Sequence, residues 1–142
     1  MAKHVAHAAV TVDAEPGVVW RSLTDPDRIA RWMMGAQVST TWQVGAPITW
    51  RGEMNGTPYE DKGEVLVAEE PSRLSMTHYS PLMGGDDVPE NYHTVTYDLS
   101  PDGGGTSVRL SQDGNDTAEQ AEQFGANWQA MLEALKQSVE SS

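Results

Sequence analysis

The C-terminal segment constrains the fold of this chain more than any other part. A strand-like run over 106–112 is followed by the turn sequence 113–116 (DGND), and one helix is predicted from there to the end of the chain. Because 38–112 is mostly strand-like, this helix has a sheet to pack on, and a curved sheet around a long helix often leaves a pocket. The helix has one apolar stripe, with steps of three and four, made of Thr117, Ala121, Phe124, Trp128, Met131, Leu132, Leu135 and Val139.

Length and composition indicate one domain. A chain of 142 residues can bury about two thirds of its unfolded surface, and no linker or repeat divides it, so we expect one domain over 1–142. The chain has no cysteine, which removes disulfides, thiol nucleophiles and thiolate metal sites. No run approaches the roughly 18 apolar residues of a membrane span, and Asp13 and Glu15 argue against a secretion signal. We therefore expect a cytoplasmic protein.

The charge of the chain is strongly negative. Its 21 acidic and 9 basic residues give a net charge of −12, which repels phosphate backbones and anionic lipids. We therefore predict no nucleic-acid partner and no membrane partner. An acidic face for a basic partner is an alternative, but the acids are scattered, and this favours solubility as their role.

The order of elements predicts an α+β fold. A strand over 4–12 precedes two short helices, for which Pro16 and Pro26 suit the first helical turns and Asp25 suits an N-cap. Strand patterns then alternate with turn signals, of which Asn55-Gly56 is the strongest. Consecutive strands joined by tight turns indicate an antiparallel sheet. The predicted strands are 48–54, 59–69, 73–79, 92–99 and 106–112.

An ordered set of short motifs spans almost the whole chain. The motifs are 16–20 (PGVVW), 23–26 (LTDP), Trp32, 63–66 (GEVL), 71–74 (PSRL), 95–99 (VTYDL), 104–106 (GGT), 127–128 (NW), Leu132 and 135–136 (LK). This set resembles the START-like, birch-pollen-allergen-like superfamily known as SRPBCC, and most of all its branch of activators of the heat-shock-protein ATPase. It is more specific for fold than for function. The resemblance implies a helix-grip fold, in which a curved antiparallel sheet of six or seven strands is closed at one end by two short helices. The long C-terminal helix then lies across the concave face.

Strand alternation predicts the lining of a cavity between this sheet and helix. If Met76 points inward, so does His78, and an inward Val95 brings His93 and Tyr97 with it. The result is a mainly apolar, aromatic wall with a few polar groups, which is typical of small-molecule sites. The predicted ligand-binding residues are Trp32, Met33, Trp50, Met76, His78, His93, Tyr97, Gln112, Phe124, Trp128 and Met131.

Each of these residues also has a purely structural interpretation. An aromatic or Met stripe at helical spacing is more often core than a ligand wall, and His93 near a loop can be half-exposed. The family pattern commonly has an aromatic residue where this chain has His78. The histidine is either a determinant of ligand specificity or a core side chain with its own hydrogen bonds, and alternation leaves both open.

Catalysis is the weaker interpretation. His78 with Tyr97 could enolise and protonate a ketone in a cyclase-type aldol closure. Alternation turns Glu53 away from Trp50, however, and no inward carboxylate is evident beside the histidine. Nucleophile and phosphate-loop motifs are missing from the sequence. We predict no catalytic residues, with cyclase-type activity as the enzymatic alternative.

No metal site or cofactor is predicted. His4 and His7 are three residues apart on a strand and should point to opposite faces. The acidic loop 86–90 lacks the ligand spacing of an EF-hand. Its neighbours Leu82, Met83, Gly84 and Gly85 suggest instead a lid over the cavity mouth.

Two functional hypotheses follow. The first is a binding module for a small hydrophobic or aromatic molecule, with Trp32, Met33 and Met34 at the entrance. The second is a co-chaperone-like or stress-related module with a protein partner, for which a filled cavity and an exposed apolar patch near Met34 would argue. Under either hypothesis we expect the protein to be a monomer or a homodimer.

Overall fold

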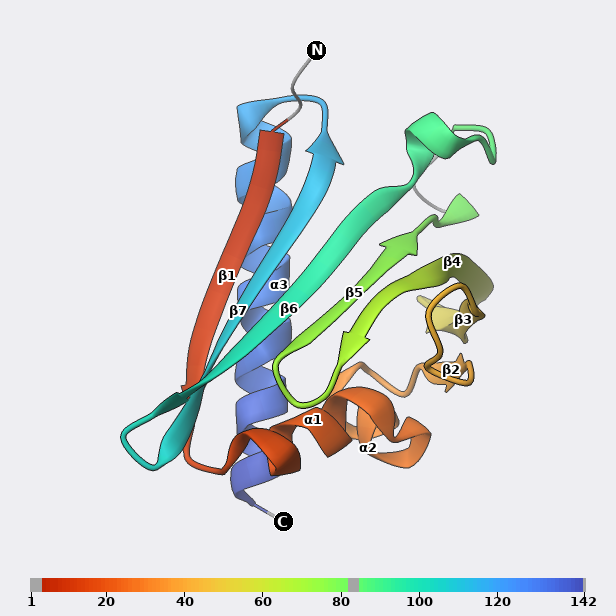
Figure 1. The fold of residues 1–142 in the computed structure, drawn as a ribbon. Helices are drawn as coiled ribbons and strands as arrows, with labels where there is room; N and C mark the ends of the chain where they lie inside the picture. The colour runs from red at the N-terminus through yellow and green to blue at the C-terminus, as the bar shows by residue number, and fades with distance from the viewer. Residues whose placement is uncertain (1–3, 82–84, 142) are drawn as a thin grey trace.

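The computed structural model describes residues 4–81 and 85–141, and these form one antiparallel sheet wrapped around a long helix (Figure 1). The sheet has seven strands in the order β1-β7-β6-β5-β4-β3-β2. Two short helices lie at one end of the sheet, and the third helix runs along it (Figure 1). This is the predicted α+β helix-grip fold. The elements are β1 (His4–Val12), α1 (Pro16–Thr24), α2 (Pro26–Trp32), β2 (Gln37–Ser39), β3 (Pro47–Met54), β4 (Thr57–Glu69), β5 (Arg73–His78), the 3-10 helix η2 (Pro89–Asn91), β6 (His93–Asp102), β7 (Gly105–Asn115) and α3 (Ala118–Glu140).

Local sequence explains the two short helices at the closed end. Pro16 and Pro26 occupy first helical positions, where a missing N–H costs nothing. The Asp25 side chain accepts a hydrogen bond of 3.0 Å from the Asp27 N–H and so caps α2. The indole N–H of Trp32 donates to the Ser22 carbonyl at 2.7 Å, which ties α2 to α1.

The last hairpin is longer than the sequence predicts. The break expected at 113–116 is wrong, because β7 continues to Asn115. Gly114 adopts a positive φ of 77°, and the fully buried Asn115 side chain donates to the carbonyls of Gln112 at 3.0 Å and His4 at 3.2 Å. These bonds hold the end of β7 against β1. Thr117 is the N-cap of α3, and its side chain accepts from the Gln120 N–H at 3.0 Å.

Helix α3 covers the edge of β1 with hydrogen bonds. The Gln129 amide accepts from the Ala9 N–H at 3.0 Å and donates to the Ala9 carbonyl at 2.7 Å. Lys136 donates to the Thr11 carbonyl at 2.8 Å. A Cβ on Gly125 would lie 3.1 Å from a backbone oxygen of β1, so the glycine allows the helix to approach. Unpaired strand edges invite pairing with other chains, and α3 blocks this one.

The apolar stripe of α3 has two different halves. Towards the C-terminus, Leu132, Leu135 and Val139 are buried in the core. Towards the N-terminus, Phe124 and Trp128 are only partly buried, although they face the sheet. The difference marks the place where sheet and helix stand apart.

We expect Gln129→Ala to lower the free energy of unfolding by about 1–2 kcal/mol, because each lost hydrogen bond contributes about 0.5–1.5 kcal/mol. Urea unfolding measures the loss, and hydrogen exchange should show faster exchange at the Ala9 amide. Gln123→Ala, on an exposed position of the same helix, is the control and should change neither quantity. Equal effects of both substitutions would contradict the role of Gln129 at the edge.

A second prediction concerns the close approach of β4 and β5. A Cβ on Gly63 would lie 1.8 Å from the Thr77 carbonyl oxygen, whereas a Cβ on Gly17 in α1 meets nothing within 4 Å. Gly63→Ala should therefore cost about 1–3 kcal/mol of stability. Gly17→Ala should be neutral or stabilising by up to about 1 kcal/mol. Thermal and urea unfolding check both, and a neutral Gly63→Ala would refute the close packing.

Candidate functional site

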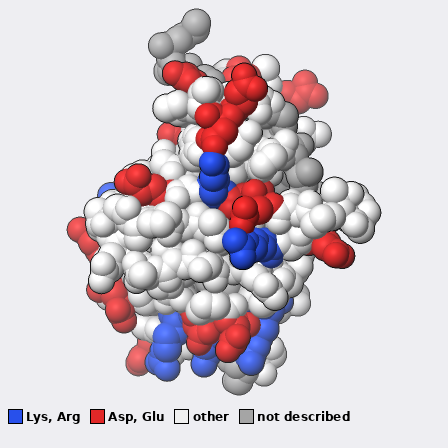
Figure 2. Space-filling view, turned by 90° about the vertical axis from the view of Figure 1, so that its right-hand side faces the viewer, with Lys and Arg blue, Asp and Glu red and all other residues white. Residues whose placement is uncertain are grey.

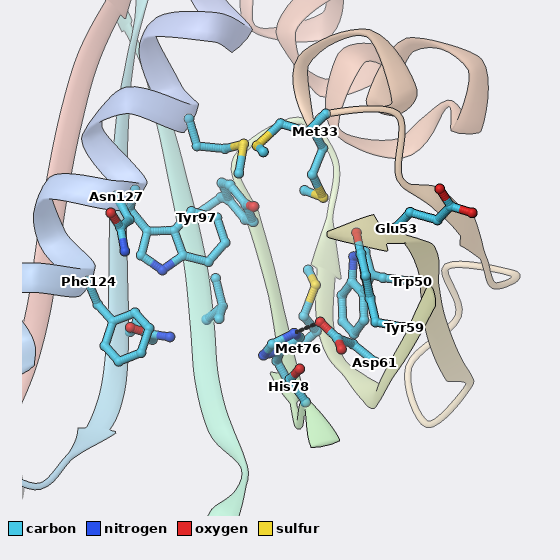
Figure 3. Close-up of a pocket in the computed structure, with 16 residues that line it drawn as sticks. Met33, Trp50, Glu53, Tyr59, Asp61, Met76, His78, Tyr97, Phe124 and Asn127 are labelled. Carbon is cyan, nitrogen blue, oxygen red and sulfur yellow. Dashed lines mark hydrogen bonds and ion pairs between the residues drawn. The ribbon is translucent and has the colours of Figure 1, made fainter. Parts of the chain in front are cut away.

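A cavity of about 400 Å³ lies between α3 and the concave face of the sheet (Figure 3). Phe124 and Asn127 reach it from α3, and Trp50, Asp61 and His78 lie across from them on the sheet. The strands diverge from α3 towards β3 and β4, which creates the space. Its lining comprises Met33, Met34, Trp50, Glu53, Tyr59, Asp61, Met76, His78, Ser80, Val95, Tyr97, Gln112, Phe124, Asn127, Trp128 and Met131.

The inner wall is apolar and aromatic. The rings of Tyr97 and Trp128 meet edge to face, with centroids 6.3 Å apart and an interplanar angle of 90°. Met76 and Met131 complete this wall from β5 and α3. Burial raises the pKa of the Tyr97 phenol above its ordinary value, since the phenolate would lose its hydration there. Tyr97 therefore stays neutral at physiological pH.

Asp61 and His78 form a polar pair in the cavity wall that the sheet provides. The distance between Nε2 of His78 and Oδ2 of Asp61 is 2.9 Å, and the two side chains are 20% and 14% exposed. The ring of Trp50 packs against the histidine, with centroids 5.0 Å apart at 73°. Oδ1 of Asp61 and Nδ1 of His78 are buried and make no hydrogen bond. The pair thus keeps unused hydrogen-bonding capacity in the cavity wall.

A second polar group comes from β7. The Gln112 side chain is in the cavity lining although the residue is only 3% exposed, and its Oε1 is buried without a hydrogen-bond partner. Buried polar atoms in folded proteins are normally paired, so this amide has capacity for a bound molecule or water.

Tyr59 stands at the β3–β4 side of the cavity. Its ring lies over Gly52, where a Cβ would be 2.8 Å from the Tyr59 hydroxyl oxygen. The pKa of Tyr59 is raised first by burial and second by the negative charge of Asp61. Asp61 therefore acts electrostatically on Tyr59 in this part of the wall.

Two predicted site residues lie outside the lining. Trp32 is 2% exposed in the core and donates its indole N–H to Ser22. His93 is buried beside Phe124, with ring centroids 6.1 Å apart, and its Nδ1 is 2.6 Å from the Asp113 carbonyl oxygen. The predicted residues that the structure brings together around the cavity are Met33, Trp50, Met76, His78, Tyr97, Gln112, Phe124, Trp128 and Met131.

The sequence analysis missed Asp61. The expectation that no inward carboxylate is evident beside His78 is wrong, because Asp61 bonds to that ring. The signal was present in the alternation of β4: counting back from the buried Val65 puts Gly63, Asp61 and Tyr59 on one face. Glu53 borders the cavity, but its carboxylate points away from it, as alternation predicts (Figure 3).

The predicted lid falls mostly outside the described residues. Leu82, Met83 and Gly84 are not described, and the next residue, Gly85, accepts a hydrogen bond of 3.0 Å from the Tyr79 hydroxyl. Within the described residues, no three His, Asp or Glu side chains gather as a metal site.

A second hollow lies between β1 and α3, and His4, Val5 and His7 all border it. The strand register shifts between His4 and Ala6. That the two histidine side chains point to opposite faces stays a prediction.

The fold and the cavity define a helix-grip protein of the SRPBCC superfamily. Within it, the chain belongs to the family described as Activator of Hsp90 ATPase homolog 1-like protein, whose model matches residues 13–140. No curated protein sequence gives a significant match. In the described part of the chain, none of the helices has the length and apolar character to cross a membrane.

Several solved structures share the fold. The solution structure of ChR145 from Cytophaga hutchinsonii is 40% identical with a TM-score of 0.86, covering 99% of this chain and 97% of that one. Protein MLL2253 from Mesorhizobium loti is 22% identical with a TM-score of 0.75, and the match covers 98% of each chain. The Aha1 dimer from Colwellia psychrerythraea is 19% identical with a TM-score of 0.74, and the match covers 96% of each chain.

The raised pKa of Tyr97 predicts an alkaline loss of stability. In the unfolded chain this phenol loses its proton near pH 10, whereas in the folded chain it keeps it. Its contribution is thus complete below pH 10 and declines above it, with a slope of up to about 1.4 kcal/mol per pH unit. We expect Tyr97→Phe to make the decline between pH 10 and 11.5 shallower, as measured by urea unfolding. The tyrosinate absorbance that develops below pH 11 should be the same in both proteins, and a clear decrease in the variant would contradict the assignment.

Proposed function

We propose that this protein binds a small hydrophobic or aromatic molecule in the cavity between α3 and the sheet. The observation that carries the proposal is the open cavity of about 400 Å³ with aromatic and Met walls. This volume lies within the range of about 300–1,000 Å³ of small-molecule pockets. An open cavity is also the outcome that distinguishes the binding module from an interaction module with a filled pocket.

The packing of α3 supports this function. Trp128 and Met131 lie on the stripe that faces the sheet, yet they are only partly buried, because they border the cavity. A helix that served packing alone would gain stability by closing this space, since voids forfeit contacts on one side. In this chain the space stays open, and Met33 and Met34, which follow α2, border it.

The energetics allow useful affinity. Burial of roughly 300 Å² of apolar ligand surface at about 25 cal/mol per Å² contributes about 7 kcal/mol before the cost of association. Hydrogen bonds to Gln112 and to the Asp61–His78 pair would set the orientation of the ligand. The apolar contribution alone does not reach the roughly 8 kcal/mol of a micromolar dissociation constant, so ring contacts and these hydrogen bonds must supply the difference and the cost of association.

Two alternatives keep specific support. Met34 is 78% exposed beside the cavity, which suits a protein contact at the mouth of a co-chaperone-like or stress-related module. The Asp61–His78 pair supplies the carboxylate-oriented histidine that a cyclase-type reaction would use. A cytoplasmic location and a monomeric or homodimeric state remain predictions.

The binding function predicts a difference between two tryptophans. Trp128 lines the cavity and Trp42 does not, although both are partly buried against the same core. The neutral fluorophore N-phenyl-1-naphthylamine should bind with micromolar affinity, and Trp128→Ala should weaken this at least tenfold, about 1.4 kcal/mol. Trp42→Ala should leave the affinity within twofold. Fluorescence titration measures both.

Native mass spectrometry of freshly purified protein provides the second test. A mass adduct that is lost on denaturation, and is absent from Trp128→Ala but present in Trp42→Ala, would support the cavity as its site. If the fluorophore does not bind, or binds equally to both variants, and no adduct is seen, the binding function is wrong. Partner capture with and without Met34→Ser would then test the interaction module.

A further inference from the structure

The cavity carries a carboxylate without a basic side chain. Asp61 is in its lining, and no Lys or Arg is among the described residues that form the wall. His78 is the other ionisable group beside Asp61. Tyr59 and Tyr97 are held neutral by raised pKa values, and the Glu53 carboxylate points away (Figure 3). The charge that a ligand meets inside is therefore that of Asp61 and its histidine partner.

Strand alternation separates the charges between the two faces of the sheet. Arg51 follows the inward Trp50, and Lys62 follows the inward Asp61, so both basic side chains lie on the convex face. There each is paired with an acid: Arg51 with Glu60, and Lys62 with Asp87. Arg73 in β5 is likewise paired with Asp98, at 2.6 Å. The cations of these strands are thus occupied outside the cavity.

The pairing of basic with acidic side chains is also visible on the molecular surface. On the face in Figure 2, Lys and Arg side chains lie beside Asp and Glu side chains. At the end formed by α1 and α2, Arg28 lies 3.7 Å from Asp25. No wide basic patch is visible on this face that would draw an anion towards the cavity (Figure 2).

The buried lining atoms without a hydrogen-bond partner can act as acceptors, while the amides of Gln112 and Asn127 in the same lining also carry N–H donors. Oδ1 of Asp61 and Oε1 of Gln112 are buried without a hydrogen-bond partner. When neutral His78 donates Nε2–H to Asp61, its unpartnered Nδ1 is an acceptor as well. Gln112 on β7 and His78 on β5 are two strands apart, about 10 Å at ordinary strand spacing. A ligand that satisfies these atoms must bring hydrogen-bond donors and span roughly two fused rings.

From the charge and the free acceptors together, we infer that the cavity selects an aromatic or apolar ligand that carries a protonated amine, and that it rejects carboxylates such as fatty acids. This inference rests on the proposed binding function. The ammonium group would lie against Asp61 and the faces of Trp50 and Tyr59, since aromatic faces attract cations. A carboxylate in the same place would lose its hydration without gaining a cationic partner.

Three naphthalene probes of nearly equal shape test the inference: 2-naphthylmethylamine, 2-naphthalenemethanol and 2-naphthoic acid. Each is titrated against bound N-phenyl-1-naphthylamine at pH 8, where an alkylammonium group is charged. We expect the amine to bind at least tenfold more tightly than the carboxylate, with the alcohol between them. Rising salt should weaken the binding of the amine only in part, because a charge pair inside the cavity is screened less than exposed charges, and it should leave the binding of the alcohol unchanged.

Asp61→Asn is the diagnostic variant, and Glu64→Gln is its matched control. Both remove one negative charge from β4, but Glu64 is exposed and outside the cavity lining. Asp61→Asn should reduce the amine-to-alcohol ratio at least fivefold, and Glu64→Gln should leave it unchanged. If Asp61→Asn does not fold, the amine-to-carboxylate ratio of the wild-type protein at high salt, where the long-range field of the net charge of −12 is screened, decides the same question.

The outcomes separate this inference from the binding function. If the three probes bind equally, if the carboxylate is preferred, or if Asp61→Asn leaves the amine-to-alcohol ratio unchanged, the charge selection is refuted while the binding site stands. If neither the fluorophore nor any probe binds, the binding function and this inference fail together.

Discussion

Helix α3 is held along the edge strand β1, and the site depends on how it is held. Leu132 and Leu135 bury its C-terminal half in the core, and Gln129 and Lys136 bond to the backbone edge of β1. The hydrogen bonds of Gln129 and Lys136 lie on the β1 side of the helix. The strands that curve away from that side, towards β3, leave the N-terminal half of the stripe facing open space. The cavity follows from docking a straight helix on one edge of a curved sheet.

The two faces of the sheet have different chemistry because neighbouring residues on a strand point in opposite directions. Trp50 and Asp61 face α3, while Arg51 and Lys62 face outward and pair with acids. The outer ion pairs are exposed and contribute little to stability. Their consequence is chemical: the basic groups of these strands are kept away from the cavity, and a net acidic chain acquires a cavity wall with one carboxylate and several free acceptors.

Family membership and cavity chemistry carry different kinds of information. The match over residues 13–140 establishes the family, and the solved relatives establish the fold. A fold of this breadth does not determine an activity. The individual character of this protein lies in side chains of the lining, above all the Asp61–His78 pair beside Trp50 and the partnerless Gln112. These residues decide which molecule would fit.

The sequence by itself determined the α+β class, the helix stripe, the Asn55-Gly56 hairpin and most strand faces, because caps, turns and alternation are local properties. It also placed Trp50, His78 and Gln112 on the inward face. Only the tertiary structure decided that Trp32 lies in the core, that His93 lies beyond the cavity, and that Asp61 in β4 meets His78 on the neighbouring strand β5. Register shifts and the separation of helix from sheet set those distances, and both arise from packing between segments far apart in the chain.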